Sequence, residues 1–348
     1  MPYPNELAPL TVTQGAMRFN TDSMKLEYYR GGPVGFGTTT QTGEWVNITT
    51  DSPDIQTGGA RGVFGGGTIQ PGSTLSNVIQ YVTISTTGNA IDFGDLSVSI
   101  TQLSSCSSST RGLFAGGTLI PSNVNTIEYI TISSTGNSQD FGDLTQARRA
   151  LGGGSSSSTR GIFAGGFDSL INVIEYITLA STGDAKDFGD LSAVRYAVSG
   201  CSSSTRGIFF GGNGSNVIEF ITISTLGNSA DFGDTLTFAD DGGSCSNSIR
   251  GLYAATTSTN NVIEFITLST LGNSTDFGDL TVIRNTGRST SSSTRGIFCG
   301  GGVGSPYTSQ NVIDYVTIMS TGNAVDFGDM TTALAQGSAC SNGHGGLG

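Results

Sequence analysis

Hydrophobic and polar residues along most of the chain alternate in short runs and show no convincing helical period. Segments such as NVIEYITL alternate β-branched or aromatic residues with polar ones, while GIFAGG is apolar and ends in glycine. Gly, Ser and Asn bound these runs, which is the pattern of short β-strands joined by tight turns. The pattern therefore predicts an all-β protein.

Two sequence anchors recur six times and define a repeat. An Arg-Gly anchor occurs at intervals of 44 to 50 residues, at Arg61, Arg111, Arg160, Arg206, Arg250 and Arg295. An Asp-Phe-Gly-Asp anchor begins at Asp92, Asp140, Asp187, Asp231, Asp276 and Asp326. Each unit reads as four strands: A, the Gly/Ser stretch before the arginine; B, GIFAGG; C, NVIEYITL; and D, around DFGDL. This length and strand number are typical of propeller blades, so we expect a six-bladed β-propeller over residues 56–348.

The two ends of the repeat region predict how the ring closes. The tail SACSNGHGGLG aligns with SSCSSSTRGLF, which contains a strand A, whereas the first unit has no good strand A before Arg61. We therefore expect residues 333–342 to pair into the first blade. Small residues suit strand A because the innermost strands crowd around the propeller axis.

Composition and charge narrow the classes of partner. The 348 residues include 53 glycines and carry a net charge of −12, with 15 basic against 27 acidic side chains. Nucleic-acid binding depends on Lys and Arg, so we expect no nucleic-acid partner. The chain has no apolar run of about 18 residues, so we expect no membrane insertion. MPYPNELAPL does not have the pattern of a signal peptide, so we expect the protein to assemble in the cytoplasm.

Histidine and cysteine usage argues against an enzyme. His344 is the single histidine, which disfavours Ser-His-Asp and Cys-His catalysis and most zinc sites. We expect no catalytic residue and no cofactor. Four of the five cysteines, Cys106, Cys201, Cys245 and Cys340, share one aligned position five residues before the arginine. Equivalent positions around a ring predict small buried side chains and not disulfide partners.

One arginine and one DFGD motif per unit predict a repeated ion pair. Both lie on turns of the same propeller face, so a charge-assisted Arg–Asp bond within or between blades would explain the stoichiometry. The residues concerned include Arg111, Asp140, Arg160, Asp187, Arg206 and Asp231. Two alternatives stay open: an anion site on a ring of arginines, or calcium held by paired aspartates. The phenylalanine of each DFGD and the strand-B aromatic are expected to fill the core between blades.

The lengths of the connections identify a candidate binding face. The C–D and D–A segments have nearly constant lengths, whereas the B–C connections vary, the longest being Thr68–Ser76 and Gly302–Gln310. Loops on a rigid scaffold commonly carry recognition, so the B–C face is the candidate surface, with Ile69, Pro71, Pro306 and Tyr307. Neutral drift of loop length is the alternative interpretation.

Residues 1–55 interrupt the repeat. Their pattern predicts strands at 16–20, 25–29 and 44–48, with a turn at 21–24 and the single Trp45 in the last strand. Three strands with one tryptophan make a weak independent core. We therefore expect this segment to depend on a partner or on the propeller.

The repeat resembles the kelch family of β-propellers. The matching features are a Gly-Gly doublet closing strand B, an aromatic residue in strand C, and an arginine after strand D at Arg148, Arg195 and Arg284. The family's strand-D tryptophan is replaced by phenylalanine, so the resemblance implies the fold and no inherited binding site. A copper-oxidase activity of kelch-type propellers would need histidine ligands, and a sialidase would need a clustered arginine triad. Neither pattern is present.

A second resemblance concerns bacteriophages. AMRFNTD, KLEYY and GEWVNI are similar to a short module of tailed-phage fibre and other virion proteins, and the repeats are similar to predicted structural proteins of marine and cyanobacterial phages. The resemblance implies a virion protein attached through Arg18, Phe19, Tyr28, Tyr29 and Trp45. It would act as a peripheral fibre or knob adhesin that presents its B–C face to a host surface component, a glycan or a protein.

Other roles stay open at this point. One alternative is a decoration, neck or tail component that binds other virion proteins. Another is a cellular kelch interaction module. A homo-oligomer is compatible with each of these roles.

Overall fold

The computed structural model describes residues 16–20, 25–31, 43–47, 60–168, 171–239, 242–254, 260–285 and 288–347. The chain divides into two compact units, Met1–Gln56 and Thr57–Gly348. The division lies one residue beyond the expected boundary. Each unit is described by itself below.

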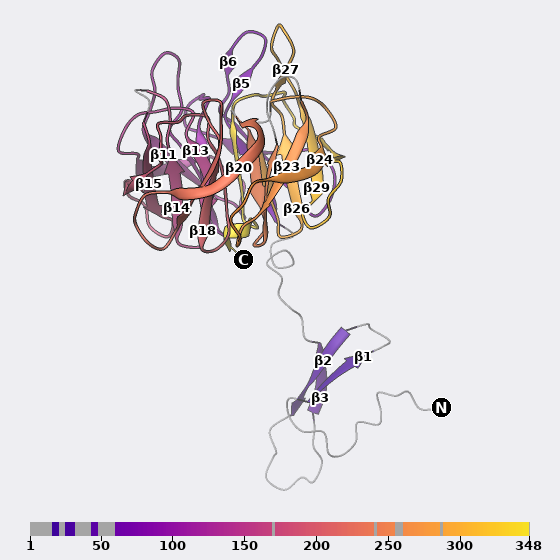
Figure 1. The fold of residues 1–348 in the computed structure, drawn as a ribbon. Coiled ribbons are helices and arrows are strands. Elements are labelled where there is room, and N and C mark those ends of the chain that lie inside the picture. Colours follow the sequence, from indigo (N-terminus) through magenta and orange to yellow (C-terminus); the bar gives the residue numbers. More distant parts are fainter. Residues whose placement is uncertain are drawn as a thin grey trace. The chain divides into compact units, whose positions relative to one another are not determined.

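The second unit consists of six four-stranded antiparallel sheets arranged as a β-propeller. Figure 1 shows it from the side. Blade 1 contains β31 (Ser338–Ser341), β4 (Arg61–Gly65), β7 (Val78–Thr83) and β8 (Ile91–Asp95); blade 2 contains β9 (Ser104–Ser107), β10 (Arg111–Ala115), β11 (Thr126–Thr131) and β12 (Gln139–Asp143); blade 3 contains β13 (Gly152–Ser156), β14 (Arg160–Ala164), β15 (Val173–Thr178) and β16 (Lys186–Asp190). Blade 4 contains β17 (Ser199–Ser202), β18 (Arg206–Phe210), β19 (Ser215–Thr222) and β20 (Ala230–Ala239); blade 5 contains β21 (Gly243–Ser246), β22 (Arg250–Ala254), β23 (Val262–Thr267) and β24 (Thr275–Asp279); blade 6 contains β25 (Arg288–Ser291), β26 (Arg295–Cys299), β29 (Val312–Thr317) and β30 (Val325–Asp329). The expected all-β, six-bladed propeller is confirmed.

The ring closes through its last strand, as the alignment of the tail predicts. β31 pairs antiparallel with β4, with Ser338 opposite Gly65 and Ser341 opposite Gly62. Blade 1 is therefore assembled from both ends of the repeat region. Because separating β31 from β4 would expose the edges of both strands, the pairing holds the ring shut.

Serines on the six innermost strands form a closed hydrogen-bonded circle around the axis. Each hydroxyl donates to the backbone carbonyl of its counterpart in the preceding blade over 2.6–2.9 Å, in the order Ser107, Ser341, Ser291, Ser246, Ser202, Ser156 and back to Ser107. These side chains are buried. Buried hydroxyls need partners, and the circle supplies one to each, which explains why strand A is rich in serine.

Aromatic side chains fill the core between blades, as expected. The strand-B aromatics and the DFGD phenylalanines are at most 2% exposed, for example Phe163 and Phe141. These two residues pack together in one cluster although they belong to blades 3 and 2. All five cysteines are buried and free, which confirms the expectation of small buried side chains without disulfides.

The first unit has a three-stranded antiparallel sheet in the order β1 (Met17–Asn20), β2 (Lys25–Gly31) and β3 (Gly43–Asn47). These strands match the expected ones within two residues at every end. The expected turn at 21–24 lies outside the described residues. Among the described residues of the whole chain, no helix is long and apolar enough to cross a membrane.

Candidate ligand-binding face

Two hairpins rise from one end of the propeller, at the top of Figure 1. The first pairs β5 (Thr68–Ile69) with β6 (Thr74–Leu75), and the second pairs β27 (Gly302–Val303) with β28 (Thr308–Ser309). They form the longest B–C connections, one on each side of the ring closure. We call this end of the propeller, which carries the B–C and D–A connections, the B–C face.

The two hairpins are hydrogen-bonded to each other. The amide of Ser309 donates to the carbonyl of Gln70 at 3.2 Å, and the amide of Gln70 donates to Oγ of Ser309 at 2.9 Å. The Ser309 hydroxyl also donates to the carbonyl of Thr68 at 3.0 Å. The hairpins therefore form one paired ridge that spans blades 6 and 1.

The four residues predicted for this face lie on the ridge with different exposures. Ile69 is 37% exposed, and Pro71 and Pro306 are exposed. Tyr307 is half-buried because its ring covers Gly302, where a side chain would collide with the ring. The structure thus brings all four residues into one ridge, but Tyr307 also has a packing role within its own hairpin.

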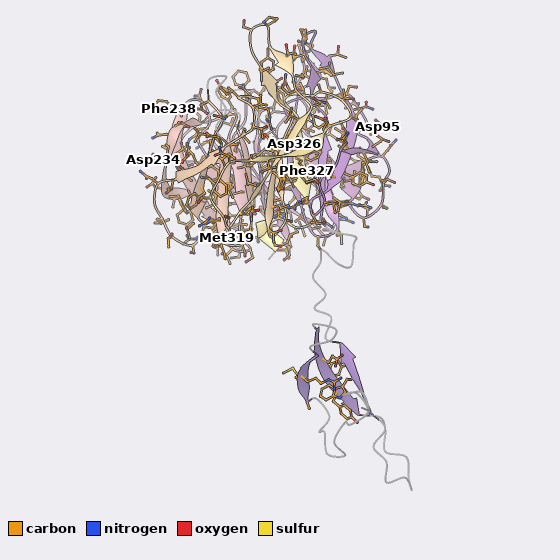
Figure 2. The ribbon with its side chains drawn as sticks, turned by 90° about the vertical axis from the view of Figure 1, so that its right-hand side faces the viewer. Asp95, Asp234, Phe238, Met319, Asp326 and Phe327 are labelled. Carbon is orange, nitrogen blue, oxygen red and sulfur yellow. The ribbon has the colours of Figure 1, made fainter. Side chains whose placement is uncertain are left out.

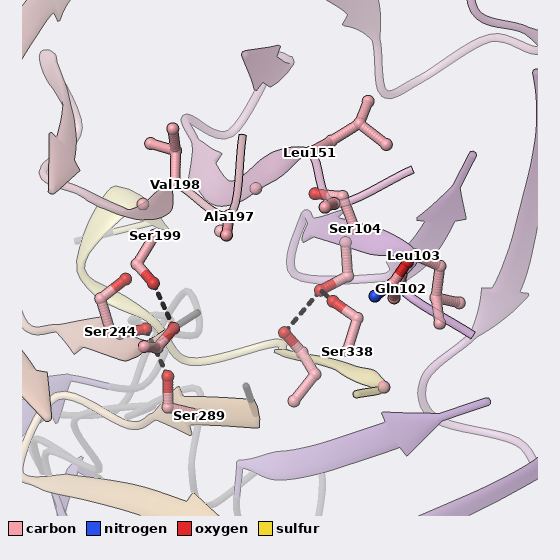
Figure 3. Close-up of a pocket in the computed structure, with 18 of the residues that line it drawn as sticks. Gln102, Leu103, Ser104, Leu151, Ala197, Val198, Ser199, Ser244, Ser289 and Ser338 are labelled. Carbon is pink, nitrogen blue, oxygen red and sulfur yellow. Dashed lines mark hydrogen bonds between the residues drawn. The ribbon is translucent and has the colours of Figure 1, made fainter. Parts of the chain in front are cut away.

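A polar pocket lies at the propeller axis on the same face, lined by D–A and strand-A residues of all six blades. Figure 3 shows this lining in close-up. Its volume is about 70 Å³, and its lining includes hydroxyl side chains, glycine backbone and two glutamines: Ser104, Ser199, Ser244, Ser289, Ser338, Gln102 and Gln336 among others. Among the described residues, Oε1 of Gln102 and Oγ of Ser104 have no hydrogen-bond partner although both atoms are buried. Both atoms belong to residues that line the pocket, and unsatisfied buried polar atoms are costly.

Sequence reasoning did not single out this pocket. Its lining residues come from the D–A loops and the first residues of strand A, which look like ordinary Gly/Ser linkers in the sequence. The sequence contains one weak indication of the pocket: two D–A loops carry a glutamine, at 102 and 336, where the other D–A loops carry other residue types.

The opposite end of the axial channel is closed by the C-terminal segment. After β31 the chain enters a short 3-10 helix, Gly345–Leu347. His344 accepts a hydrogen bond at Nδ1 from the amide of Gly346 at 3.1 Å, so its proton sits on Nε2, 3.1 Å from the carbonyl of Ser107. Burial lowers the pKa of His344 to about 4. The imidazole is therefore neutral at pH 7 and acts as a hydrogen-bonding plug.

The predicted Arg–Asp repeat is wrong. Among the described residues, none of the six Arg-Gly arginines forms an ion pair with a DFGD carboxylate. Arg111 instead donates from Nη1 to the carbonyl of Leu179 in blade 3, at 3.0 Å, and its guanidinium lies 4.9 Å from the ring centre of Tyr129. The same pair of contacts repeats in every blade. Arginine therefore links blades through a carbonyl and an aromatic face.

The DFGD aspartates face outward, which explains the failed pairing. The first aspartate of each motif is exposed, and the second is half-buried or exposed; Figure 2 places Asp95 and Asp234 at opposite edges of the propeller. The motif acts through its backbone: the amide of Asp95 donates to Oδ1 of Asn137 in the next C–D turn at 3.1 Å. Among the described residues, no group of three or more His, Cys, Asp or Glu side chains could hold a metal ion.

A different set of arginines does form buried ion pairs. Arg148, Arg195 and Arg284, which follow strand D, contact Glu175, Glu219 and Asp314 on strand C of the next blade at 3.2, 2.9 and 2.9 Å. All six side chains are at most 5% exposed. Burial lowers the pKa of Arg148, and the carboxylate of Glu175 partly opposes that shift.

The residues predicted for virion attachment cluster in part. The Nε of Arg18 lies 2.8 Å from a carboxylate oxygen of Glu27, and its guanidinium lies 4.3 Å from the ring centre of Trp45. Tyr29 packs edge-on against Trp45 with ring centres 5.4 Å apart. Tyr28 is half-buried, and the side chain of Phe19 lies outside the described residues.

These contacts make the sheet of the first unit a small packed element around Trp45. Its Nε1 atom is buried without a hydrogen-bond partner among the described residues. No protein-family model matches the chain, and a search of the curated proteins finds no match.

Proposed function

We propose that this chain is a virion protein of a tailed bacteriophage whose propeller presents the B–C face to a component of the host surface. The observation that carries the proposal is the ridge of two hydrogen-bonded hairpins at the ring closure. A scaffold without a binding role has no need to elongate these two connections together and join them. The propeller would act as a binding module and not as an enzyme.

A glycan is the favoured class of ligand. The axial pocket beside the ridge is lined by serine hydroxyls, glutamine amides and glycine backbone, which are the groups that hydrogen-bond sugar hydroxyls. Gln102 and Ser104, which line this pocket, belong to that polar set. The first unit would attach the protein to the particle through the Arg18–Trp45 cluster.

A structural role within the virion is the second candidate, and a different surface favours it. Phe238 and Leu236, on β20 of blade 4, are 68% and 57% exposed; Figure 2 shows Phe238 at the outer edge of the propeller. Large apolar side chains at a rim favour contact with another protein. In this role the propeller rim would join the chain to neighbouring virion proteins.

Binding of the purified full chain to candidate host bacteria, and to particles that lack the protein, distinguishes the two roles. A host-binding role predicts saturable binding to cells that Ile69→Asp reduces at least tenfold and Tyr307→Ala weakens. Ile91→Asp is the matched control, because Ile91 lies on the outer strand β8 of blade 1 and is 58% exposed. Binding to particles alone, sensitive to Phe238→Asp, would instead establish the structural role.

A further inference from the structure

Each pair of adjacent blades encloses a space, here called a notch, between two aligned positions. One is the fifth residue after DFGD, on the D–A connection. The other is the third residue of the strand-C core in the next blade, at Gln80, Glu128, Glu175, Glu219, Glu264 and Asp314. Five of these six positions carry a carboxylate, and all six are at most 8% exposed.

Three notches are filled by the arginine of the chain itself. Arg195 shows the full set of contacts: an ion pair with Glu219, and hydrogen bonds from Nη1 to the carbonyls of Gly211 and Val217 at 3.3 and 3.2 Å. Arg148 and Arg284 occupy the corresponding notches. A guanidinium head beside a carboxylate, with its hydrocarbon stem in the apolar space, is thus the native occupant of a notch.

The notch between blades 1 and 2 keeps the carboxylate but has lost the arginine. Ile100 stands at the arginine position, and Glu128 is 8% exposed. Glu128 accepts hydrogen bonds from the amide and hydroxyl of Ser97 and from the hydroxyl of Ser138. No cation among the described residues pairs with it. Its negative charge therefore lies in a largely buried site without the counter-charge that Arg148, Arg195 and Arg284 supply elsewhere.

A cavity of about 150 Å³ occupies this same notch. Glu128, Gly116 and Thr126 line it, and the last two correspond to Gly211 and Val217, whose carbonyls bind Arg195. Apart from Ser97, the remaining walls are apolar: Leu96, Val98, Ile100, Leu103, Phe114, Leu119 and Val124. Val98 and Leu119 are 44% and 37% exposed, so the cavity reaches the surface beside them. A cavity of this size holds a molecule as large as benzene.

The other two notches without an aligned arginine differ from this one in their polar contacts. Between blades 6 and 1, Leu334 stands at the arginine position and the neutral Gln80 at the carboxylate position, and Arg288 reaches across from β25 to the carbonyl of Gly66. Between blades 4 and 5, Glu264 receives four hydrogen bonds, from the amides of Leu236 and Thr237 and from two hydroxyls.

We propose that the notch between blades 1 and 2 is a binding site for an alkylguanidinium group. The cation pairs with Glu128 and lies near Gly116 and Thr126, while the hydrocarbon chain packs against Ile100, Leu103 and Phe114. The ligand thus supplies from outside the chain the guanidinium group that Arg148, Arg195 and Arg284 supply in the other notches. This inference stands independently of the virion role proposed above. The group would come either from a free small molecule or from an arginine side chain of a partner.

Calorimetric titration of the full chain with n-butylguanidinium tests the proposal. We expect saturable binding at one site per chain. The neutral isostere n-butylurea should bind at least about tenfold more weakly, because it offers N–H donors to Glu128 but no positive charge to pair with the carboxylate. The blocked peptide Gly-Arg-Gly separates the two sources: binding as tight as that of n-butylguanidinium would admit an arginine side chain, and exclusion of the peptide would assign a small molecule.

Three variants locate the site. Glu128→Gln should abolish binding, whereas Glu264→Gln, the same change in blade 5, should leave it intact. Ile100→Arg supplies the guanidinium from the chain itself, so it should abolish binding and raise the melting temperature. If Glu128→Gln does not fold, Ile100→Arg still tests the proposal. Equal affinity for n-butylurea, undiminished binding to Ile100→Arg or Glu128→Gln, or no binding to the unmodified chain would each overturn the proposal.

Discussion

Gly112 of blade 2 packs directly against the thiol of Cys340, on the strand that closes the ring. A β-carbon on Gly112 would lie 2.7 Å from that sulfur. The equivalent glycine of every Arg-Gly anchor faces the small side chain of strand A in the preceding blade, which is Cys, Ser or Thr. The glycine of the anchor is therefore required by contact between blades.

Replacing Gly112 by alanine should destabilise the propeller by about 1–3 kcal/mol, the usual cost of overpacking a buried site. The double variant Gly112→Ala/Cys340→Ala should recover most of the loss, since it removes the sulfur that the new methyl group meets. Urea unfolding measures both. Gly207→Ala is the control, because its nearest atom across the blade boundary, Cβ of Ser155, lies 3.4 Å away. An equal loss at Gly207 would contradict the packing argument.

The contacts of Arg111 predict unequal effects of two substitutions in one repeat. Arg111→Ala should lower the free energy of unfolding by about 1–2 kcal/mol, because it removes a stacking contact with Tyr129 and a bond to the carbonyl of Leu179. Asp140→Ala should change it by less than about 0.5 kcal/mol, since Asp140 is exposed. Similar losses of unfolding free energy for both variants, or a double variant no less stable than either single one, would show that Arg111 and Asp140 form an ion pair after all.

The buried pair of Arg148 and Glu175 should tolerate joint replacement better than single replacement. Arg148→Leu alone leaves a buried carboxylate and should cost about 3–5 kcal/mol. The double variant Arg148→Leu/Glu175→Gln copies the combination that the chain already uses at Leu334 and Gln80, and should cost much less. Chemical denaturation of the three proteins decides this point. A double variant as unstable as the single one would show that the notch needs a guanidinium.

His344 should make stability depend on pH between about 6.5 and 4. Its folded-state pKa of about 4 lies below the ordinary value of 6.5, so the unfolded chain takes up the proton first. This group therefore leaves stability intact above pH 6.5 and lowers it progressively as the pH falls to about 4, by at most about 3 kcal/mol. The difference between the unmodified chain and His344→Gln isolates the effect from the carboxylates. A difference independent of pH would contradict the neutral imidazole.

The sequence predicts the propeller well because each blade repeats its whole pattern. The strand-B and strand-D aromatics, the Arg-Gly turn and the aligned tail fix the number of blades and the closure by β31. The partner of Arg111 was not predictable in the same way. The repeat places arginine and DFGD on one face, but the acceptor is a backbone carbonyl of the next blade, which no side-chain pattern reveals.

The candidate site likewise has features that the sequence predicts and features that only the three-dimensional packing reveals. Unequal loop lengths identify the face and the two hairpins that carry Ile69 and Pro306. The axial pocket depends on where the D–A loops converge, and its serines look like linker residues in the sequence. Ile100 differs from Arg148 at an aligned position, yet only the packing of blades 1 and 2 shows that this difference opens a cavity beside Glu128.

The buried cysteines make a direct test of the binding face practicable. Burial raises the pKa of the Cys201 and Cys340 thiols to about 12, so we expect all five native cysteines to react poorly with maleimides. A single exposed cysteine can then carry a polyethylene glycol chain. Thr74→Cys places it on the first hairpin of the B–C face, and Thr87→Cys places it on the exposed C–D turn of the same blade, at the opposite face.

Binding of these two labelled proteins to host bacteria is the most direct test of the central claim. We expect the label at position 74 to abolish binding to cells and the label at position 87 to leave it unchanged. Loss of binding only with the label at position 87, or equal binding by both labelled proteins, would contradict the assignment of the B–C face.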